Sequence, residues 1–356
     1  MTGAGAISDS GVPGAAPHAA PQSADGQKPF ATRAGVRRLL HAAVAAPSVH
    51  NTQPWRFRRV DDATMELYAD LDRLLSVTDP MGRGLGISCG AALFNLRLAI
   101  RMTGHAPQVL PLPDPGERPD LLATVRATPD GPPDQDERLL FGMIPHRRTN
   151  RFPFDGRPLA RNVFLDLVTA AHTEGATLVP VKGRTARRVL DLVAVAEGTL
   201  TAEESYRAEL ARWVGSEARS DGVPEHAFGP RPRHGELPMR DFAVGDLPPG
   251  TREQADFEPY PQLAVLFTTD DGPLDWLRAG QALQRVLLTA TAHGVAASMF
   301  SQPLDVRPPQ HRGDHAGPFG YVQMLVRFGY GPPVPHVPRR PVFEVLDRRT
   351  REARRG

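Results

Sequence analysis

The pattern of hydrophobic and polar positions contains two long apolar runs that resemble each other. One begins with Gly-Ala-Ala-Leu at residues 90–93 and reaches Gly104, and the other begins with Gly-Gln-Ala-Leu at residues 280–283 and reaches Gly294. Leucine or valine recurs at matching places in both, which is the spacing of a mostly buried helix that ends at a glycine. The sequence therefore predicts two buried helices that are copies of one another.

Shorter segments repeat around these helices in the same order. The helix-like segments are VRRLLHAAVAAPS (36–48) and NVFLDLVTAAHTEG (162–175), and the strand-like segments are DLLATVRA (120–127) and YVQMLVRFGY (321–330). We therefore predict an α+β fold of two tandem units, residues 33–134 and 135–347, joined by the Pro- and Asp-rich stretch TPDGPPDQDE. The alternative is a chance similarity between two buried helices.

Three segments fall outside this repeat. Residues 1–32 are rich in Gly, Ala, Pro and Ser, which predicts a disordered tail and no signal peptide, and residues 348–356 form a basic tail. Residues 213–250 are charged, punctuated by Pro and Gly, and without periodicity. So long an irregular segment inside a domain is either a linker or a functional lid, and the sequence leaves both open.

Charge and composition narrow the class of protein. The 42 Lys and Arg residues against 40 Asp and Glu residues give a net charge of +2, so no global field favours nucleic acid or an anionic membrane surface. No window has the ~20 uninterrupted apolar residues of a membrane span. Cys89 is the single cysteine, which favours a reducing, cytoplasmic location. The histidines show no metal-binding spacing, so we expect no metal site.

A short basic motif, HRRTNR at residues 146–151, is the first candidate for binding chemistry. Arg147, Arg148 and Arg151 could hold one phosphate, because arginine forks match phosphate oxygens bidentately. Nucleic-acid contact would require further basic or aromatic neighbours, and here prolines and phenylalanines flank the motif. A solvated charge run on a loop is the remaining alternative.

A polar cluster in the first unit, PSVHNTQPW at residues 47–55, is the second candidate. It occurs once, as HRRTNR does, and each unit has one motif and lacks the other. A single site shared between the two units would permit this complementary loss. The alternative is a turn in which Asn51 and Pro54 set the backbone and Trp55 belongs to the core.

Together these motifs resemble the FMN-binding nitroreductase family. The resemblance rests on SxxNxQPW after an AAP turn, on the RRTNR run, and on GYG…PRRP at residues 329–341. Three features are similar to the Acg-like branch of this family: the duplication within a single chain, HRRTNR in the middle of the chain, and DGVP at 221–224. The resemblance implies a nitroreductase-like α+β fold in which the two units form an intramolecular pseudo-dimer with one FMN per chain.

The resemblance also implies roles for individual residues. Arg147, Arg148 and Thr149 match the phosphate-binding run, Arg151 matches a basic residue near N1 and O2 of the flavin, and Arg340, with Arg339 beside it, matches the basic residue that closes over the phosphate. The residues that match the ribityl and ring-edge contacts are Ser48, Asn51 and Gln53, and those that could offer a backbone N–H to flavin N5 are Ala297, Ser298 and Met299.

The implied activity is electron transfer from NAD(P)H through FMN to a small electron-poor acceptor, such as a nitroaromatic or a quinone. The cofactor would carry the chemistry, so no catalytic acid, base or nucleophile is expected of the chain, which would act as a monomer. A non-turnover protein that sequesters FMN or senses redox state beneath a lid is the alternative. A more distant one is a serine hydrolase using GISCG at residues 86–90, although no apolar strand precedes that motif.

Overall fold

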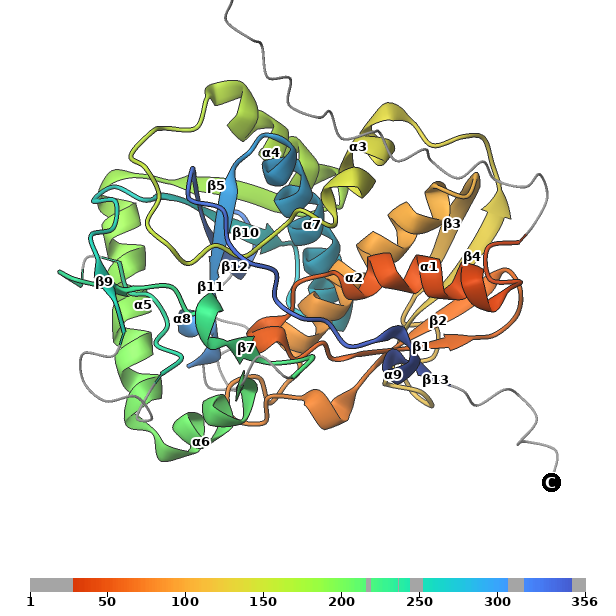
Figure 1. The fold of residues 1–356 in the computed structure, drawn as a ribbon, viewed down its shortest axis with the longest axis horizontal. Coiled ribbons are helices and arrows are strands. Elements are labelled where there is room, and N and C mark those ends of the chain that lie inside the picture. The colour runs from red at the N-terminus through yellow and green to blue at the C-terminus, as the bar shows by residue number, and fades with distance from the viewer. Residues whose placement is uncertain (1–27, 216–218, 236, 244–251, 307–316, 348–356) are drawn as a thin grey trace, which may run out of the picture.

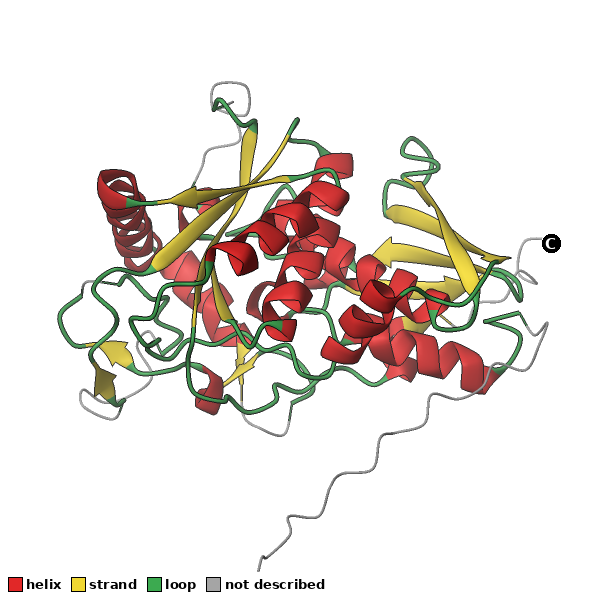
Figure 2. Cartoon of the chain, turned by 90° about the horizontal axis from the view of Figure 1, so that it is seen from above, coloured by secondary structure: helices red, strands yellow, loops and turns green. Residues whose placement is uncertain are grey.

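The computed structural model describes residues 28–215, 219–235, 237–243, 252–306 and 317–347. Two sheets lie at opposite ends of the molecule with helices between them (Figures 1 and 2). The helices are α1 (Arg33–Val44), α2 (Arg83–Arg101), α3 (Gln135–Met143), α4 (Arg161–Thr173), α5 (Gly183–Ala202), α6 (Glu204–Trp213), α7 (Pro273–Ala292), α8 (Gln302–Asp305) and α9 (Val342–Val345), with 3₁₀ turns η1 (Val49–Asn51), η2 (Leu71–Arg73) and η3 (Glu225–Ala227). The predicted α+β class is confirmed.

Each sheet is built mainly from one part of the chain. The first has the order β13 (Leu346–Asp347), β1 (Trp55–Arg59), β2 (Thr64–Ala69), β4 (Leu121–Pro129), β3 (His105–Pro111), and the second has the order β11 (Ala296–Phe300), β12 (Tyr321–Gly329), β10 (Gln262–Thr268), β5 (Thr177–Val181). Neighbouring strands are antiparallel except for β1 and β13, which are parallel. Both predicted strand segments and all four predicted helical segments are present.

The two buried helices cross at the glycines that begin the repeated motifs. A Cβ atom at Gly90 of α2 would lie 2.2 Å from the carbonyl oxygen of Leu277, and one at Gly280 of α7 would lie 2.0 Å from that of Ile87. Both distances are far below van der Waals contact, so only glycine allows the backbones to approach this closely. The repeat thus marks the contact surface between α2 and α7.

The hydrophobic cores on the two sides interlock through these helices. One core is formed by α1, α2 and the first sheet, and a second by α4, α7 and the second sheet. Leu277 and Leu288 of α7 belong to the first core, whereas Ile87 of α2 belongs to the second. Between the helices, the Gln284 carboxamide donates a buried hydrogen bond to Asn95 Oδ1 at 2.8 Å. The two sides therefore share apolar burial and one buried hydrogen bond between side chains.

The end of the described chain returns to the first sheet. Leu346 and Asp347 pair in parallel with Phe57 and Arg58 of β1, and α9 packs beside α1 with Val342 and Val345 buried in the first core. At the other end, Phe30 is also buried in that core. Within the tails expected at 1–32 and 348–356, residues 1–27 and all of 348–356 lie outside the described residues.

An inserted region between β5 and β10 contains two helices that the repeat did not indicate. Leu190, Val193 and Leu200 are the buried side of α5, and α6 buries Tyr206 and Leu210. Two short parallel pairs follow, β6 (Val214–Gly215) with β7 (Val223–Pro224), and β8 (Arg231–Pro232) with β9 (Gln254–Ala255). Parts of the predicted 213–250 segment, namely 216–218, 236 and 244–250, lie outside the described residues.

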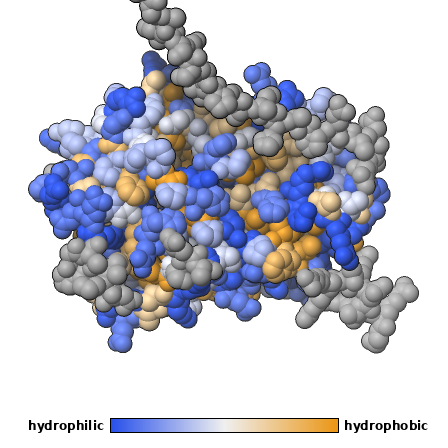
Figure 3. All heavy atoms as spheres, viewed as in Figure 1, coloured by the Kyte–Doolittle hydropathy of each residue, from blue (hydrophilic) through white to orange (hydrophobic). Residues whose placement is uncertain are grey.

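Among the described residues, every helix is too short or too polar to cross a membrane. The face shown in Figure 3 is a mixture in which hydrophilic residues are abundant.

Candidate functional site

The polar cluster after α1 adopts an unusual backbone conformation. His50, Asn51 and Gln53 have φ values of 48°, 55° and 51°, a left-handed region that non-glycine residues rarely occupy. Such conformations cost about 1–3 kcal/mol each and persist only where the surroundings impose them. Here the Ser48 Oγ accepts the Gln53 backbone N–H at 2.9 Å and the Ser88 Oγ accepts that of Val49 at 3.3 Å. The hydroxyls and carboxamides of the motif thus maintain a strained loop.

Asn51 joins this loop to two distant segments. Its Nδ2 donates to the carbonyl oxygens of Gly222 at 2.9 Å and Pro338 at 3.1 Å, and its Oδ1 accepts from Arg339 Nη1 at 3.0 Å. Gly222 lies in the insertion, whereas Pro338 and Arg339 lie in the segment that returns to the first sheet. Asn51 therefore holds both segments against the loop.

Gln53 and Arg340, both predicted from sequence to contact the cofactor, have partners within the protein. Gln53 is fully buried, where its Nε2 donates to the Ser220 carbonyl at 2.8 Å and its Oε1 accepts the Arg340 backbone N–H at 2.8 Å. The Arg340 guanidinium lies 3.3 Å from the Asp70 carboxylate. Neither residue lines the cavities described below. Arg339, its neighbour, does.

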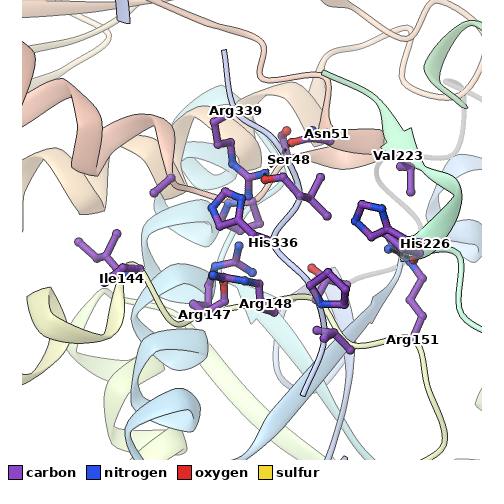
Figure 4. A pocket seen from close by; sticks show the side chains of 18 of the residues that line it. Ser48, Asn51, Ile144, Arg147, Arg148, Arg151, Val223, His226, His336 and Arg339 are labelled. Atoms are coloured by element: carbon purple, nitrogen blue, oxygen red, sulfur yellow. Dashed lines mark hydrogen bonds between the residues drawn. The ribbon is translucent and has the colours of Figure 1, made fainter. Parts of the chain in front are cut away.

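A single cavity, which we call the cationic cavity, is lined by the other arginines of the sequence motifs. Figure 4 shows Arg147 and Arg148 on one side of it, Arg339 on the other and Arg151 farther along. Among the described residues, none of these four guanidiniums has a carboxylate within 4.0 Å, and no Asp or Glu lines the cavity. Most other buried arginines of the described chain do have such a partner: Arg240 lies 2.7 Å from Asp305, for example. The cavity therefore has a concentration of positive charge that the protein itself does not neutralise.

Burial makes this charge costly. Arg147 is 4% exposed, and its Nε and Nη1 have no hydrogen-bond partner in the described structure. Burial, followed by repulsion from Arg339 and Arg148, lowers the pKa of Arg147 to about 9. Burial and neighbouring arginines likewise lower the pKa of Arg151 and of Arg339 to about 10. All three stay charged at neutral pH, so a bound anion would relieve the repulsion between them.

A second, largely apolar cavity adjoins the cationic one. The two cavities share the lining residues Pro47, Ser48, Thr149 and Arg151, so they lie side by side, and we refer to them together as the compartment. Its apolar part is lined by side chains from α2, α7 and the second sheet, namely Ile87, Ala91, Leu283, Met299, Phe300 and Met324. The compartment thus has a cationic end and a largely apolar end, with Arg151 where they meet.

The loop after α3 is fixed to the second sheet. Thr149 forms a parallel bridge with Ala297, and the Asn150 backbone N–H donates to the Ala297 carbonyl at 2.9 Å. The same strand, β11, brings Ser298 and Met299 to the apolar cavity, whereas Ala297 does not line it. The residues predicted from sequence that line the compartment are Ser48, Asn51, Arg147, Arg148, Thr149, Arg151, Ser298 and Met299.

Insertion residues complete the walls of both cavities. Val223, His226 and Ala227 line the cationic part, and Met239, Arg240 and Phe242 line the apolar part. The carbonyl oxygen of Ala227 accepts from Arg151 Nη1 at 2.9 Å, and Phe242 lies under that guanidinium at 4.7 Å. Val223 belongs to the DGVP motif at 221–224, but no site role was predicted for it or for the other insertion residues that line the cavities.

His50 and Arg240 form a second feature that the sequence did not indicate. Arg240 Nη1 lies 3.4 Å from His50 Nε2, and because a guanidinium can only donate, Nε2 is the acceptor and Nδ1 bears the proton. Burial, then the charges of Arg240 and Arg151, place the pKa of His50 well below its usual value. A neutral imidazole therefore lines the apolar cavity. The left-handed φ of His50 was not detectable from sequence.

The GISCG motif does not have the geometry of a nucleophile elbow. Residues 86–90 lie within α2, where the Ser88 hydroxyl donates to the Gly84 carbonyl at 2.7 Å, as a helical serine commonly does. An elbow requires a sharp turn between a strand and a helix. We expect Ser88→Ala to leave hydrolysis of a simple aryl ester unchanged in a spectrophotometric assay. Complete loss of an esterase activity in this variant would restore the hydrolase hypothesis.

Comparison with known proteins identifies the family. No family model matches the chain. The chain is 36% identical over 321 residues, 88% of its length and 91% of the relative's, to "Putative NAD(P)H nitroreductase Rv3131" of Mycobacterium tuberculosis. It is 30% identical over 90% of its length to "Putative NAD(P)H nitroreductase acg" of the same organism, covering 97% of that protein. The chain therefore belongs to the nitroreductase family, and the resemblance to its Acg-like branch is confirmed.

Other similar proteins give less support for the family assignment. "Uncharacterized protein Rv3127" of M. tuberculosis is 31% identical over 87% of this chain. Among solved structures, the FMN-dependent nitroreductase NfnB of Mycobacterium smegmatis, in complex with NADPH, is 16% identical with a TM-score of 0.36, covering 60% of this chain and 99% of its own. The family assignment therefore rests on the sequence relatives.

Proposed function

We propose that this chain is an FMN-binding oxidoreductase of the nitroreductase type, which transfers electrons from NAD(P)H to a small electron-poor acceptor such as a nitroaromatic or a quinone. The observation that carries the proposal is the compartment with Arg147, Arg148 and Arg339 at one end, Arg151 at its middle and apolar walls at the other end, where no described carboxylate lies within 4.0 Å of these arginines. A phosphate satisfies the cationic end and a flat aromatic ring system satisfies the apolar end, and FMN has both.

The residues present fit this cofactor. Arg147, Arg148 and Arg339 would hold the phosphate, because they are the guanidiniums around the cationic cavity and Arg147 has unpartnered donors. Ser48, Asn51 and Thr149 line the path toward the apolar cavity, where Ser298 and Met299 of β11 lie. Gln53, Ala297 and Arg340 would act through their contacts with these residues and not by touching the cofactor.

FMN, when bound, supplies the redox chemistry, in which a hydride from the nicotinamide brings two electrons that pass with protons to the acceptor. The contribution of the chain is orientation and electrostatics. Arg151 lies where the cavities meet and is held by the Ala227 carbonyl and the Phe242 ring. A fixed guanidinium at that place favours negative charge on the nearby edge of a bound ring system. No acid, base or nucleophile of the chain is required.

We propose that the two units, 33–134 and 135–347, act as an internal dimer in a monomeric chain with one FMN. Support comes from the crossing of α2 and α7 at equivalent glycines and from the fact that both units contribute residues to the cationic cavity. Asn51 belongs to the first unit, whereas Arg147 and Arg339 belong to the second, yet all line one cavity. The pairing of β13 with β1 of the first sheet adds support, because it joins the C-terminal segment of the second unit to the first.

A second candidate function is non-turnover FMN binding, either sequestration or redox sensing. The insertion favours it, because Met239, Arg240 and Phe242 occupy the apolar wall that an entering nicotinamide would have to approach. Arg240 is bound to Asp305 at 2.7 Å and Ser301 at 3.2 Å, which holds that wall in place.

The absorbance spectrum of the purified chain tests the proposed cofactor. We expect a flavin absorbance spectrum. The flavin-to-protein ratio, or the mass of the native complex, should correspond to one FMN per chain. Protein that is colourless and stays so after incubation with excess FMN would overturn the proposal.

Anaerobic mixing with NADPH or NADH separates the two candidate functions. The oxidoreductase predicts that the flavin absorbance bleaches within seconds and returns when a quinone or nitroaromatic is added. Flavin that is reduced by dithionite but by neither nicotinamide would favour the non-turnover protein.

A further inference from the structure

We propose that His336 is a further ligand of the phosphate group and that it takes up a proton when that group binds. This inference deepens the proposed function, on which it rests, and concerns a residue that no sequence motif indicated. His336 lies in the segment between β12 and α9 and lines the cationic cavity. Figure 4 shows its ring between Arg339 on one side and Arg147 and Arg148 on the other.

The surroundings of the ring are entirely cationic or neutral. The titratable groups that line the same cavity are Arg147, Arg148 and Arg151 from the loop after α3, His226 from η3, and Arg339 from its own segment. No carboxylate of the described chain lines the cavity. A positive charge on His336 would therefore have only repulsive neighbours until an anion enters.

The pKa of His336 reflects these neighbours. Burial, followed by the charges of Arg148, Arg339 and Arg147, lowers it below the usual histidine value. His336 is an exposed residue, so water weakens this effect, and a pKa below the usual histidine value leaves the ring neutral near pH 7. It is then a partner of limited strength for a phosphate, whereas the imidazolium donates charge-assisted hydrogen bonds.

An entering phosphate reverses the balance. Its charge of about −1.5 to −2 at neutral pH offsets the guanidiniums and stabilises the imidazolium, so the pKa of His336 rises on binding. Because the bound state then holds more protons on this residue, its contribution to affinity is full at low pH. That contribution disappears as the pH rises through the pKa of the bound form.

The phosphate titrates in the same pH range and must be separated from the histidine. Its second pKa is about 6, and a cationic cavity favours the dianion, which releases protons on binding. Only the difference between wild-type and a His336 variant isolates the histidine. His146→Gln is the matched control, because His146 precedes Arg147 in the same loop but is exposed and does not line the cavity.

The experiment is titration calorimetry of flavin-free wild-type, His336→Gln and His146→Gln with FMN, from pH 6 to 8.5 and in buffers of different ionisation enthalpy. We expect wild-type and His336→Gln to bind FMN equally at pH 8.5, which also shows that the variant is folded. At pH 6 wild-type should bind about threefold to tenfold more tightly, since one pKa unit corresponds to a factor of ten. Wild-type should also take up more protons.

Further measurements decide the outcome. His146→Gln should behave as wild-type, and riboflavin, which lacks the phosphate, should show the same pH dependence with wild-type and His336→Gln. Equal pH dependence and proton uptake for FMN in these two proteins would overturn the role of His336 while leaving the proposed function intact. Failure of wild-type to bind FMN at any pH would overturn the proposed function and, with it, this inference.

Discussion

Arg147→Met is expected to weaken FMN binding by about 100-fold or more, because the variant loses at least two charge-assisted hydrogen bonds of about 1.5–3 kcal/mol each. The same variant should leave the flavin-free protein at least as stable as wild-type. Arg147 is buried among cations, and its Nε and Nη1 lack partners. Replacing it with an apolar side chain of similar length removes an uncompensated buried charge. Flavin occupancy and thermal unfolding of the flavin-free protein measure the two effects.

Arg138→Met provides the matched control for Arg147→Met. Arg138 is an exposed residue of α3 that lies outside the cavity, so we expect normal flavin occupancy and little change in unfolding temperature. An Arg147→Met protein with full occupancy would contradict the phosphate site. One that lost occupancy only because it was unfolded would contradict the expected gain in stability.

Gly280→Ala is expected to destabilise the fold by about 3 kcal/mol or to prevent folding. The new Cβ would lie 2.0 Å from the Ile87 carbonyl oxygen and 2.8 Å from the Gly90 Cα. These are backbone atoms of a packed helix, so no side-chain rotation can relieve the overlap, and α2 and α7 must separate. Urea unfolding monitored by circular dichroism measures the free energy of unfolding.

Gly198→Ala is the matched control for this substitution. Gly198 lies in the exposed side of α5, and a Cβ there meets nothing within 4 Å. Alanine should therefore stabilise that helix by about 0.5–1 kcal/mol through its higher helix propensity. If the Gly198→Ala and Gly280→Ala proteins have the same free energy of unfolding, then α2 and α7 do not approach each other as closely at Gly280 as described.

Local patterns in the sequence were sufficient to predict the central helices and the two candidate motifs. The apolar periodicity of 90–104 and 280–294 indicated buried helices, because apolar residues at helical spacing form a face that packs against the protein interior. The reason for the glycines at 90 and 280 was not available, since a helix crossing depends on two segments far apart in sequence. The helix α5 did carry a detectable signal in the spacing of Leu190, Val193 and Leu200.

The roles of individual side chains were less predictable than the position of the site. Gln53 and Arg340 have side chains suited to binding a ligand. In the structure, however, the Gln53 carboxamide donates to the Ser220 carbonyl and the Arg340 guanidinium pairs with the Asp70 carboxylate. Arg240 could not be placed either, because its partners His50 and Asp305 come from different parts of the sequence. Chemistry identifies what a side chain can bind, whereas folding decides which partner it meets.

The position of the last described strand has a consequence for how the protein is made. A ribosome adds residues in order, so β1 and β2 are synthesised long before the strand that completes the edge of their sheet. His336 and Arg339 emerge equally late, although the cavity they line also requires Asn51. A nascent chain can therefore form its early helices and strands, but the proposed phosphate site cannot be complete until residues 336–339 have been synthesised.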